Sequence, residues 1–198
     1  MQIKIINNGP YVVDGDIPIK EVTTLFGEKG AAVDYAEGKT FEPTAQKKFI
    51  CRCGRSKNMP FCDGSHINNF EGAETDNRKN YDDEAELIKG ERCSYLNNEK
   101  LCSYSGFCVN GYDYEAAAGK CDSGCMVLVD GDGNKIETAL PKEIFIVANE
   151  SATGPAFVRG GIQITSGDGF NYEIRNRVTL CRCGKSKNKP FCDGSHKH

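Results

Sequence analysis

A cysteine-rich motif of 16 residues occurs twice in this chain, and it constrains the fold more than any other feature. The segment CRCGRSKNMPFCDGSH covers residues 51–66, and CRCGKSKNKPFCDGSH covers residues 181–196. The two copies differ only where Lys185 replaces Arg55 and Lys189 replaces Met59. Because a solenoid needs at least three stacked units, two copies predict a paired arrangement of two equivalent halves.

The repeat extends upstream of the motif, where the two copies differ in length. Residues 9–19 align with residues 154–164 at an offset of 145 positions, whereas the motifs are offset by 130 positions. The first half therefore carries 15 additional residues between positions 20 and 50.

Short β-branched or aromatic runs surround both motifs and are separated by Gly, Pro, Asn or Asp, a pattern typical of strands. They predict an α+β fold that is mostly β. Two β units, at residues 1–68 and 142–198, would pair as an intramolecular pseudo-dimer. We expect the strands at residues 4–6, 11–13, 17–19, 144–148, 156–159, 162–165, 172–175 and 177–180.

The middle segment, residues 69–141, has a different composition. Residues 71–92 include eight acidic and four basic side chains, which is typical of a solvated linker. The acidic first turn of residues 82–87 predicts a short helix. We therefore expect a small, partly helical, Cys-rich insert between the two β units.

Each motif carries four side chains that can bind a metal. Cys51 and Cys53 would share one face of an extended segment, and Cys62 and His66 would share one face of a helical turn. Asp63 is placed to cap that turn. Ser56 is expected to offer its hydroxyl to a sulfur. Three thiolates and one imidazole suit either zinc or an iron–sulfur cluster, and the spacing leaves both open.

Histidine usage supports a ligand role for these positions. The chain has three histidines, and two of them, His66 and His196, occupy equivalent positions of the two motifs. Histidines placed for unrelated reasons would not coincide in this way.

Both motifs resemble the signature C-x-C-x2-S-x3-P-x-C-D-G-S-H of the CDGSH iron–sulfur (NEET) family, with every signature position present. The resemblance implies that each motif binds one [2Fe-2S] cluster through three cysteines and one histidine, with zinc as the alternative. Members of that family dimerise by pairing strands around two clusters, so both halves of such a dimer would lie in this chain. The implied ligands are Cys51, Cys53, Cys62 and His66 in the first motif, and Cys181, Cys183, Cys192 and His196 in the second.

The implied ligand set carries expectations about chemistry. Replacing one thiolate by a neutral imidazole leaves an oxidised cluster less negative, which should raise its reduction potential. Because a protonated histidine cannot bind a metal, electron uptake and cluster release should both depend on pH. Basic residues near the motifs would stabilise cluster charge, dock an acidic redox partner, or be ordinary solvated charges: Arg52, Arg55, Lys57, Arg182, Lys185, Lys187 and Lys189.

Five further cysteines lie in the middle segment: Cys93, Cys102, Cys108, Cys121 and Cys125. Residues 101–108 and 121–124 resemble the C-x5-C and C-P-S-G elements of a divergent ferredoxin-like segment that accompanies tandem CDGSH domains, although Asp122 stands where that pattern has Pro. One interpretation is an additional iron–sulfur cluster or metal held by Cys102, Cys108, Cys121 and one of Cys93 or Cys125. The other is buried thiols, or a disulfide formed during handling.

Charge and hydropathy limit the cellular compartments and the classes of partner that we expect for this chain. A formal net charge of −3 lacks the basic excess of general nucleic-acid binders, and no apolar run reaches the 18 residues of a membrane span. The first residues lack the features of a secretory signal, so we expect a cytoplasmic protein. In that compartment thiols stay reduced, and 11 cysteines indicate metal or redox chemistry rather than a disulfide framework.

The sequence favours a carrier over an enzyme. It has neither a dinucleotide-binding fingerprint nor a phosphate-binding loop. We expect a monomeric iron–sulfur protein that exchanges electrons with a redox partner or delivers clusters to an apo-protein acceptor, without nucleic-acid or membrane partners. The alternatives are a redox enzyme or reductase component that uses the middle cysteines, and a structural zinc-binding interaction module.

Overall fold

The computed structural model describes residues 1–27, 30–41, 47–91, 93–110, 118–148 and 154–197. In these residues strands dominate, and helix is limited to residues 118–120 and short 3-10 turns. The predicted α+β, mostly β class is confirmed. The 3-10 turns are η1 (Tyr81–Asp83), η2 (Glu99–Leu101), η3 (Phe107–Asn110) and η4 (Ser195–Lys197).

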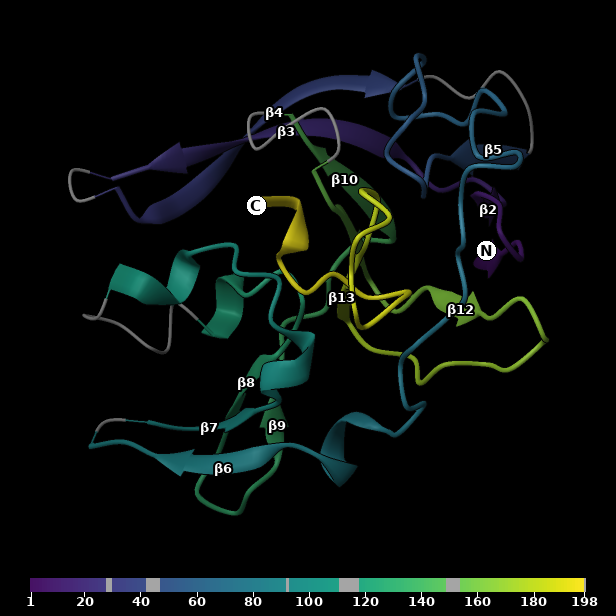
Figure 1. Cartoon of the computed structure of the whole chain (residues 1–198). Coiled ribbons are helices and arrows are strands. Elements are labelled where there is room, and N and C mark those ends of the chain that lie inside the picture. Colours follow the sequence, from purple (N-terminus) through teal and green to yellow (C-terminus); the bar gives the residue numbers. More distant parts are fainter. Residues whose placement is uncertain (28–29, 42–46, 92, 111–117, 149–153, 198) are drawn as a thin grey trace.

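Two of the three sheets are built jointly by the two halves of the chain (Figure 1). The first sheet has the order β12-β1-β2-β5, and the second has the order β13-β11-β10-β3-β4. The first half supplies β1 (Gln2–Ile5), β2 (Tyr11–Asp14), β3 (Ile19–Phe26), β4 (Ala32–Phe41) and β5 (Lys47–Ile50). The second half supplies β10 (Glu143–Val147), β11 (Ala156–Arg159), β12 (Gln163–Thr165) and β13 (Arg177–Leu180).

Each half donates one strand to the sheet of the other half. Strand β12 runs parallel to β1, with Ile164 opposite Ile3. Strand β3 runs parallel to β10, with Ile19 opposite Ile144. In both sheets the donated strand lies beside the first strand of the receiving half, and antiparallel pairing continues to the strand before the motif. The paired halves expected from the repeat are therefore joined by exchanged strands.

The additional residues of the first half form a long hairpin. Strand β3 continues to Phe26 and pairs antiparallel with β4. Most residues of β4 are exposed, so this strand shows no regular alternation of buried and exposed side chains. The second half has a short β12 at the equivalent place, followed by a single bridge between Thr165 and Asn171. The length difference read from the sequence is thus located in one hairpin.

The third sheet lies within the middle segment and has the order β6-β7-β8-β9. Its strands are β6 (Glu86–Lys89), β7 (Ser94–Asn97), β8 (Met126–Val129) and β9 (Lys135–Ile136). The helix expected at residues 82–87 is wrong: a 3-10 turn at Tyr81–Asp83 is followed, after Glu84 and Ala85, by β6. The hydrogen bonds and packing that β7 supplies to β6 outweigh the helical preference of the acidic residues.

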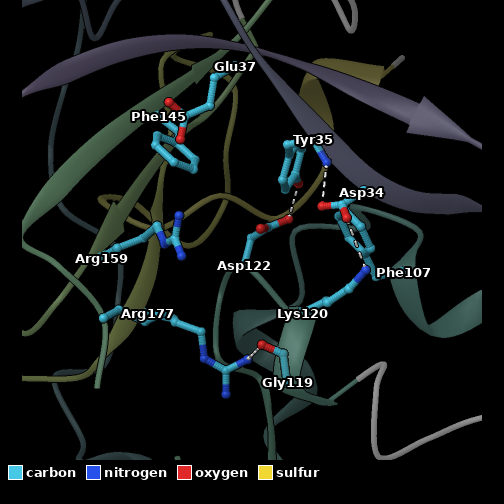
Figure 2. A pocket seen from close by; sticks show the side chains of 11 residues that line it. Asp34, Tyr35, Glu37, Phe107, Gly119, Lys120, Asp122, Phe145, Arg159 and Arg177 are labelled. Carbon is cyan, nitrogen blue, oxygen red and sulfur yellow. Dashed lines mark hydrogen bonds and ion pairs between the residues drawn. The ribbon is translucent and has the colours of Figure 1, made fainter. Parts of the chain in front are cut away.

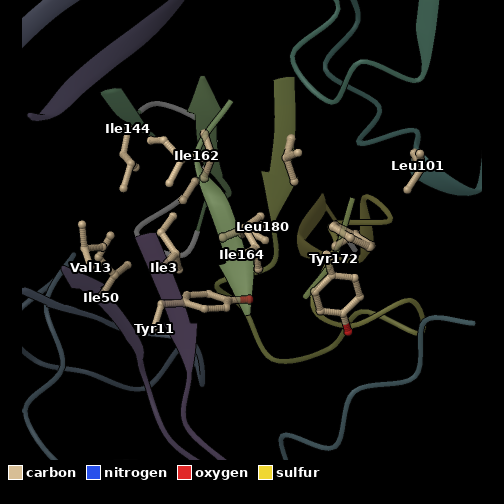
Figure 3. Close-up of a cluster of buried hydrophobic side chains, with 14 of the residues drawn as sticks. Ile3, Tyr11, Val13, Ile50, Leu101, Ile144, Ile162, Ile164, Tyr172 and Leu180 are labelled. Carbon is tan, nitrogen blue, oxygen red and sulfur yellow. The ribbon is translucent and has the colours of Figure 1, made fainter. Parts of the chain in front are cut away.

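The core is a layer of aliphatic side chains from strands of both halves (Figure 3). In β1 the alternation is clear, because Ile3 and Ile5 are buried while Lys4 is exposed. Strand β10, in contrast, is buried at all five positions, since it lies between two other strands and is covered on both faces. This shared core fixes the two motifs relative to each other.

Two further strand expectations change. Residues 17–19 were expected to be a strand of their own, but Ile17 precedes the strand, which starts at Ile19. Residues 172–175 form no strand, because only Asn171 makes a bridge there and no neighbouring edge continues the pairing. Among the described helices, none has the length and apolar character required to cross a membrane.

Candidate metal centres

The first motif begins where β5 ends, so the strand delivers its cysteines. Cys51 follows Ile50 directly, and its N–H donates to Pro60 O (2.8 Å), while Cys62 N–H donates to Phe49 O (2.7 Å). These bonds close residues 51–62 into a loop on the end of β5. Within the loop the Sγ atoms of Cys51 and Cys53 lie 3.7 Å apart.

The second pair of candidate ligands is held by a turn built around Asp63. Its carboxylate accepts hydrogen bonds from Lys57 N–H (2.8 Å) and Ser65 N–H (3.0 Å), which lower the pKa of Asp63 well below its usual range. The turn brings His66 Nδ1 to 3.3 Å from Cys62 Sγ. The capping role predicted for Asp63 is therefore seen.

The second motif repeats this geometry after β13. Cys181 and Cys183 have their Sγ atoms 3.6 Å apart, and Cys192 Sγ lies 3.4 Å from His196 Nδ1. Cys192 N–H donates to Thr179 O (2.9 Å), as Cys62 does to the equivalent residue of β5. All eight predicted ligands therefore lie in matched pairs.

The pair distances test which kind of group these residues fit. Two sulfurs on one tetrahedral ion at about 2.3 Å lie about 3.7 Å apart, and a sulfur and an imidazole nitrogen on such an ion lie about 3.6 Å apart. Each observed pair therefore has the span of two ligands on one metal ion. Among the described residues, however, no group of three His, Cys, Asp or Glu side chains is placed to hold a single ion.

The comparison with protein families agrees with this geometry. The model of the iron-binding zinc finger CDGSH type matches residues 8–67 and 153–197, which together exceed half of the chain. This chain belongs to the CDGSH family. The matched regions contain both motifs together with the strands that lead into them. No curated protein and no solved structure matches this chain.

The two CDGSH motifs lie against each other through their glycines. A Cβ placed on Gly54 would lie 2.8 Å from Cys183 O, and one on Gly184 would lie 3.2 Å from Cys53 O. Both glycines also have positive φ, +73° and +76°. Only glycine allows this conformation together with this approach, so each motif limits what the other can accommodate.

Of the basic residues near the CDGSH motifs, Arg52 and Arg182 are buried, 2% and 1% exposed. Arg52 donates to Ile6 O (3.0 Å), and Arg182 donates to Gly154 O (2.7 Å). These two side chains tie the CDGSH loops to the chain before each β unit's second strand. They are therefore wrong as candidates for docking a partner, whereas Arg55, Lys57, Lys185 and Lys187 are exposed.

The motif serines have a different role from the one predicted. Ser56 Oγ donates to Phe61 O (2.6 Å) and accepts from Asn58 N–H (3.0 Å), and Ser186 makes the equivalent bonds. The hydroxyl therefore shapes the CDGSH loop instead of facing a sulfur. Backbone groups do face sulfurs, because Lys185 N–H lies 3.4 Å from Cys183 Sγ.

Sequence reasoning missed Tyr11, which connects the first half to the second motif. Its hydroxyl donates to Cys181 O (2.8 Å) and Pro190 O (3.1 Å), and its side chain is buried. Burial raises the pKa of Tyr11 well above its usual value, so the hydroxyl remains a donor. The aligned residue of the other half is Ala156, so the repeat gave no signal for this contact.

The structure brings together four of the five middle cysteines. Cys102, Cys108, Cys121 and Cys125 line one cavity of about 210 Å³. Cys121 and Cys125 have their Sγ atoms 3.4 Å apart. Hydrogen bonding to Cys125 lowers the pKa of both Cys121 and Cys102 below that of an ordinary thiol.

Cys93 lies away from this group. Cys93 precedes Ser94, which lies opposite Val129 at one end of the β7–β8 pair. Cys125 precedes Met126, which lies opposite Asn97 at the other end of that pair. At about 3.4 Å per residue, this places Cys93 roughly 17 Å from Cys125 along the strand pair. Of the two candidates for a fourth ligand, the structure favours Cys125.

A second cavity, of about 220 Å³, lies between the β3–β4 hairpin and the segment that carries Cys121 (Figure 2). Asp34, Tyr35 and Lys120 face one another across it, and Tyr35 donates a hydrogen bond to Asp122. The sequence gave no indication of this cavity, because its walls come from segments that are far apart in the chain, from Asp34 in β4 to Arg177 in β13.

Proposed function

We propose that this CDGSH protein binds two [2Fe-2S] clusters and serves in electron transfer or in cluster delivery. One cluster would be held by Cys51, Cys53, Cys62 and His66, and the other by Cys181, Cys183, Cys192 and His196. The observation that carries the proposal is the repeated pairing of candidate ligands at 3.3 to 3.7 Å in both motifs. Family membership supports an iron–sulfur group in preference to zinc.

The exposure of the ligands supports a carrier role. Cys51 and Cys181 are buried, whereas His66 and His196 are half-buried. An open hollow of about 650 Å³ is lined by His66 and the residues that follow it. Cys62 and Cys183 are half-buried as well, so each set of ligands has a partly exposed side where a proton or an acceptor protein can reach it.

The bound cluster would supply one-electron chemistry, and a histidine ligand would raise its reduction potential relative to an all-cysteine cluster. The protein's own residues would tune access and charge. Asp63 holds the turn that carries His66, and the exposed Arg55 and Lys57 offer a basic surface beside it. This surface is suited to an acidic redox partner or acceptor.

Anaerobic purification followed by visible spectroscopy tests the proposal. The wild-type protein should be red-brown, with iron and acid-labile sulfide in equal amounts. His66→Cys and His196→Cys should each retain iron but shift the absorption spectrum and lower the reduction potential, because a thiolate replaces an imidazole. His198→Cys is the matched control and should leave both unchanged. A colourless protein that contains zinc, or unchanged spectra in the motif variants, would contradict the ligand assignment.

A further inference from the structure

Four thiols share one cavity outside the CDGSH motifs. Cys102, Cys108, Cys121 and Cys125 line it, together with Phe107 and Met126. Cys121 and Cys125 are buried, Cys102 is half-buried and Cys108 is exposed, so the cavity has a closed end and an open end. The CDGSH proposal leaves these four cysteines without a role.

The four thiols are not arranged as disulfides. The cysteines of the described residues are all free, and the 3.4 Å between Cys121 Sγ and Cys125 Sγ exceeds the bond length of about 2.05 Å. That distance is close to the span of two sulfurs on one tetrahedral metal ion, as in the CDGSH pairs. Cys125 also contacts Cys102 by a hydrogen bond, and burial together with the neighbouring Cys102 and Cys121 raises the pKa of the Cys108 thiol.

The number of thiols and the size of the cavity favour a cluster over a single ion. A structural zinc site closes four ligands around one point. Within the part of the chain that the structure describes, no three such donors converge in that way. Four cysteines around a cavity of about 210 Å³ instead match a group with several metal atoms, each bound by one or two thiolates.

The loop that carries Cys121 is held from outside by Arg177. Its guanidinium is buried and donates to Cys121 O (2.8 Å) and Gly119 O (3.2 Å), and also to Ala118 O. Figure 2 shows this side chain reaching the loop from β13, with the Tyr35–Asp122 hydrogen bond holding the same loop from β4. Such fixed anchors place a ligand before the metal binds.

The backbone near Cys125 is equally constrained. Gly124 has a φ of +61°, and a Cβ on it would lie 2.9 Å from Arg177 O. Ser123 Oγ is buried and lies 3.6 Å from Cys121 Sγ, so a hydroxyl is close to the sulfur. Hydrogen bonds to sulfur and an apolar shell are two of the means by which proteins tune iron–sulfur clusters.

We propose that Cys102, Cys108, Cys121 and Cys125 hold a third iron–sulfur cluster, which is distinct from the two of the CDGSH motifs. The ligand set is all cysteine, and Cys93 is excluded from it. An all-cysteine cluster has a lower reduction potential than one with a histidine ligand. The third cluster would therefore differ in potential from the two CDGSH clusters.

Metal counts on the intact chain test this proposal. We expect the wild-type protein to contain two or four more iron atoms per chain than Cys121→Ser or Cys125→Ser, with an equal difference in acid-labile sulfide. Cys93→Ser is the matched control, because it removes a thiol from the same segment but not from the cavity. It should keep the wild-type counts.

A second variant keeps the test independent of folding and of the CDGSH proposal. Cys62→Ala combined with Cys192→Ala removes one ligand from each CDGSH motif and leaves the cavity intact. We expect this protein to retain iron and sulfide in equal amounts and to give a paramagnetic signal in one redox state. If the CDGSH motifs held no cluster, its counts would equal those of the wild type.

Three results would overturn the third cluster. One is the absence of any iron from the variant that combines Cys62→Ala with Cys192→Ala. Another is one zinc per chain that is lost in Cys121→Ser. The last is loss of iron in Cys93→Ser to the same extent as in Cys121→Ser, which would show that the thiols of the insert act only on folding.

Discussion

The contact between the two CDGSH motifs predicts that a substitution in the first motif damages the second. In Gly54→Ala the new Cβ would lie 2.8 Å from Cys183 O, whereas ordinary contacts begin at 3.4 Å. The backbone of Cys183 would have to move by several tenths of an ångström. Because Cys183 is a proposed ligand of the second cluster, that displacement acts directly on the second motif.

The cost has two parts that a control separates. An alanine with positive φ costs roughly 1 to 2 kcal/mol, and overpacking at a contact costs about 1 to 3 kcal/mol. Gly169→Ala carries only the first cost, because Gly169 has a φ of +92° with nothing within 4 Å of its Cβ position. We therefore expect Gly54→Ala to lose about 2 kcal/mol more of the free energy of unfolding than Gly169→Ala. For a chain of this length that difference lowers Tm by a further 4 to 8 °C or so.

Thermal unfolding followed by circular dichroism measures the stability difference, and visible absorption at fixed temperature measures cluster loss. Gly54→Ala should lose colour in two phases, the faster of which comes from the second motif. That phase should be absent when Cys192→Ala, which removes a ligand of the second motif, is combined with Gly54→Ala. The steric reasoning fails if Gly54→Ala and Gly169→Ala have the same Tm, or if only the first motif loses its cluster.

Three further predictions follow from single contacts. Tyr11→Phe removes the donor to Cys181 O and should lower the free energy of unfolding by about 1 to 3 kcal/mol, measured by urea denaturation. The control Tyr104→Phe, at an exposed position, should cause no measurable loss. Acidification should bleach the visible absorption, because protonated imidazoles cannot bind iron, and His66→Cys combined with His196→Cys should resist bleaching at the same pH; equal bleaching in both proteins would contradict this. Arg177→Leu should lower the iron content of the middle cavity while the CDGSH absorption persists, and full retention of iron there would show that the anchor is dispensable.

The pairing of cysteines and histidines within each CDGSH motif could be predicted because its geometry is local. Each set lies within 16 consecutive residues, and the turn at Asp63 depends on groups a few positions away. The strands β1, β2 and β11 were also predictable, since most of their buried residues are β-branched or aromatic and turn residues bound them.

Other features depend on partners that are distant in the chain. Strand β4 has mostly exposed positions, and it is a strand because it pairs with β3. Its sequence lacks the alternation of apolar and polar residues that would have predicted a strand. Strand β6 carries charged residues and is held by β7. The contact of Tyr11 with Cys181 spans 170 positions, so only the folded chain reveals it. Residues 172–175 have strand-like composition but no adjacent edge, which shows that composition without a partner is insufficient.

The exchange of β3 and β12 has a consequence for how the two halves can exist. If the chain were cut between them, each fragment would carry one strand whose place is in the other fragment, and the edges of β1 and β10 would lie open. Open edges recruit other strands, including those of unrelated chains. Joining the halves in one polypeptide keeps the correct partner at a high effective concentration, so each edge is filled before a foreign strand can reach it.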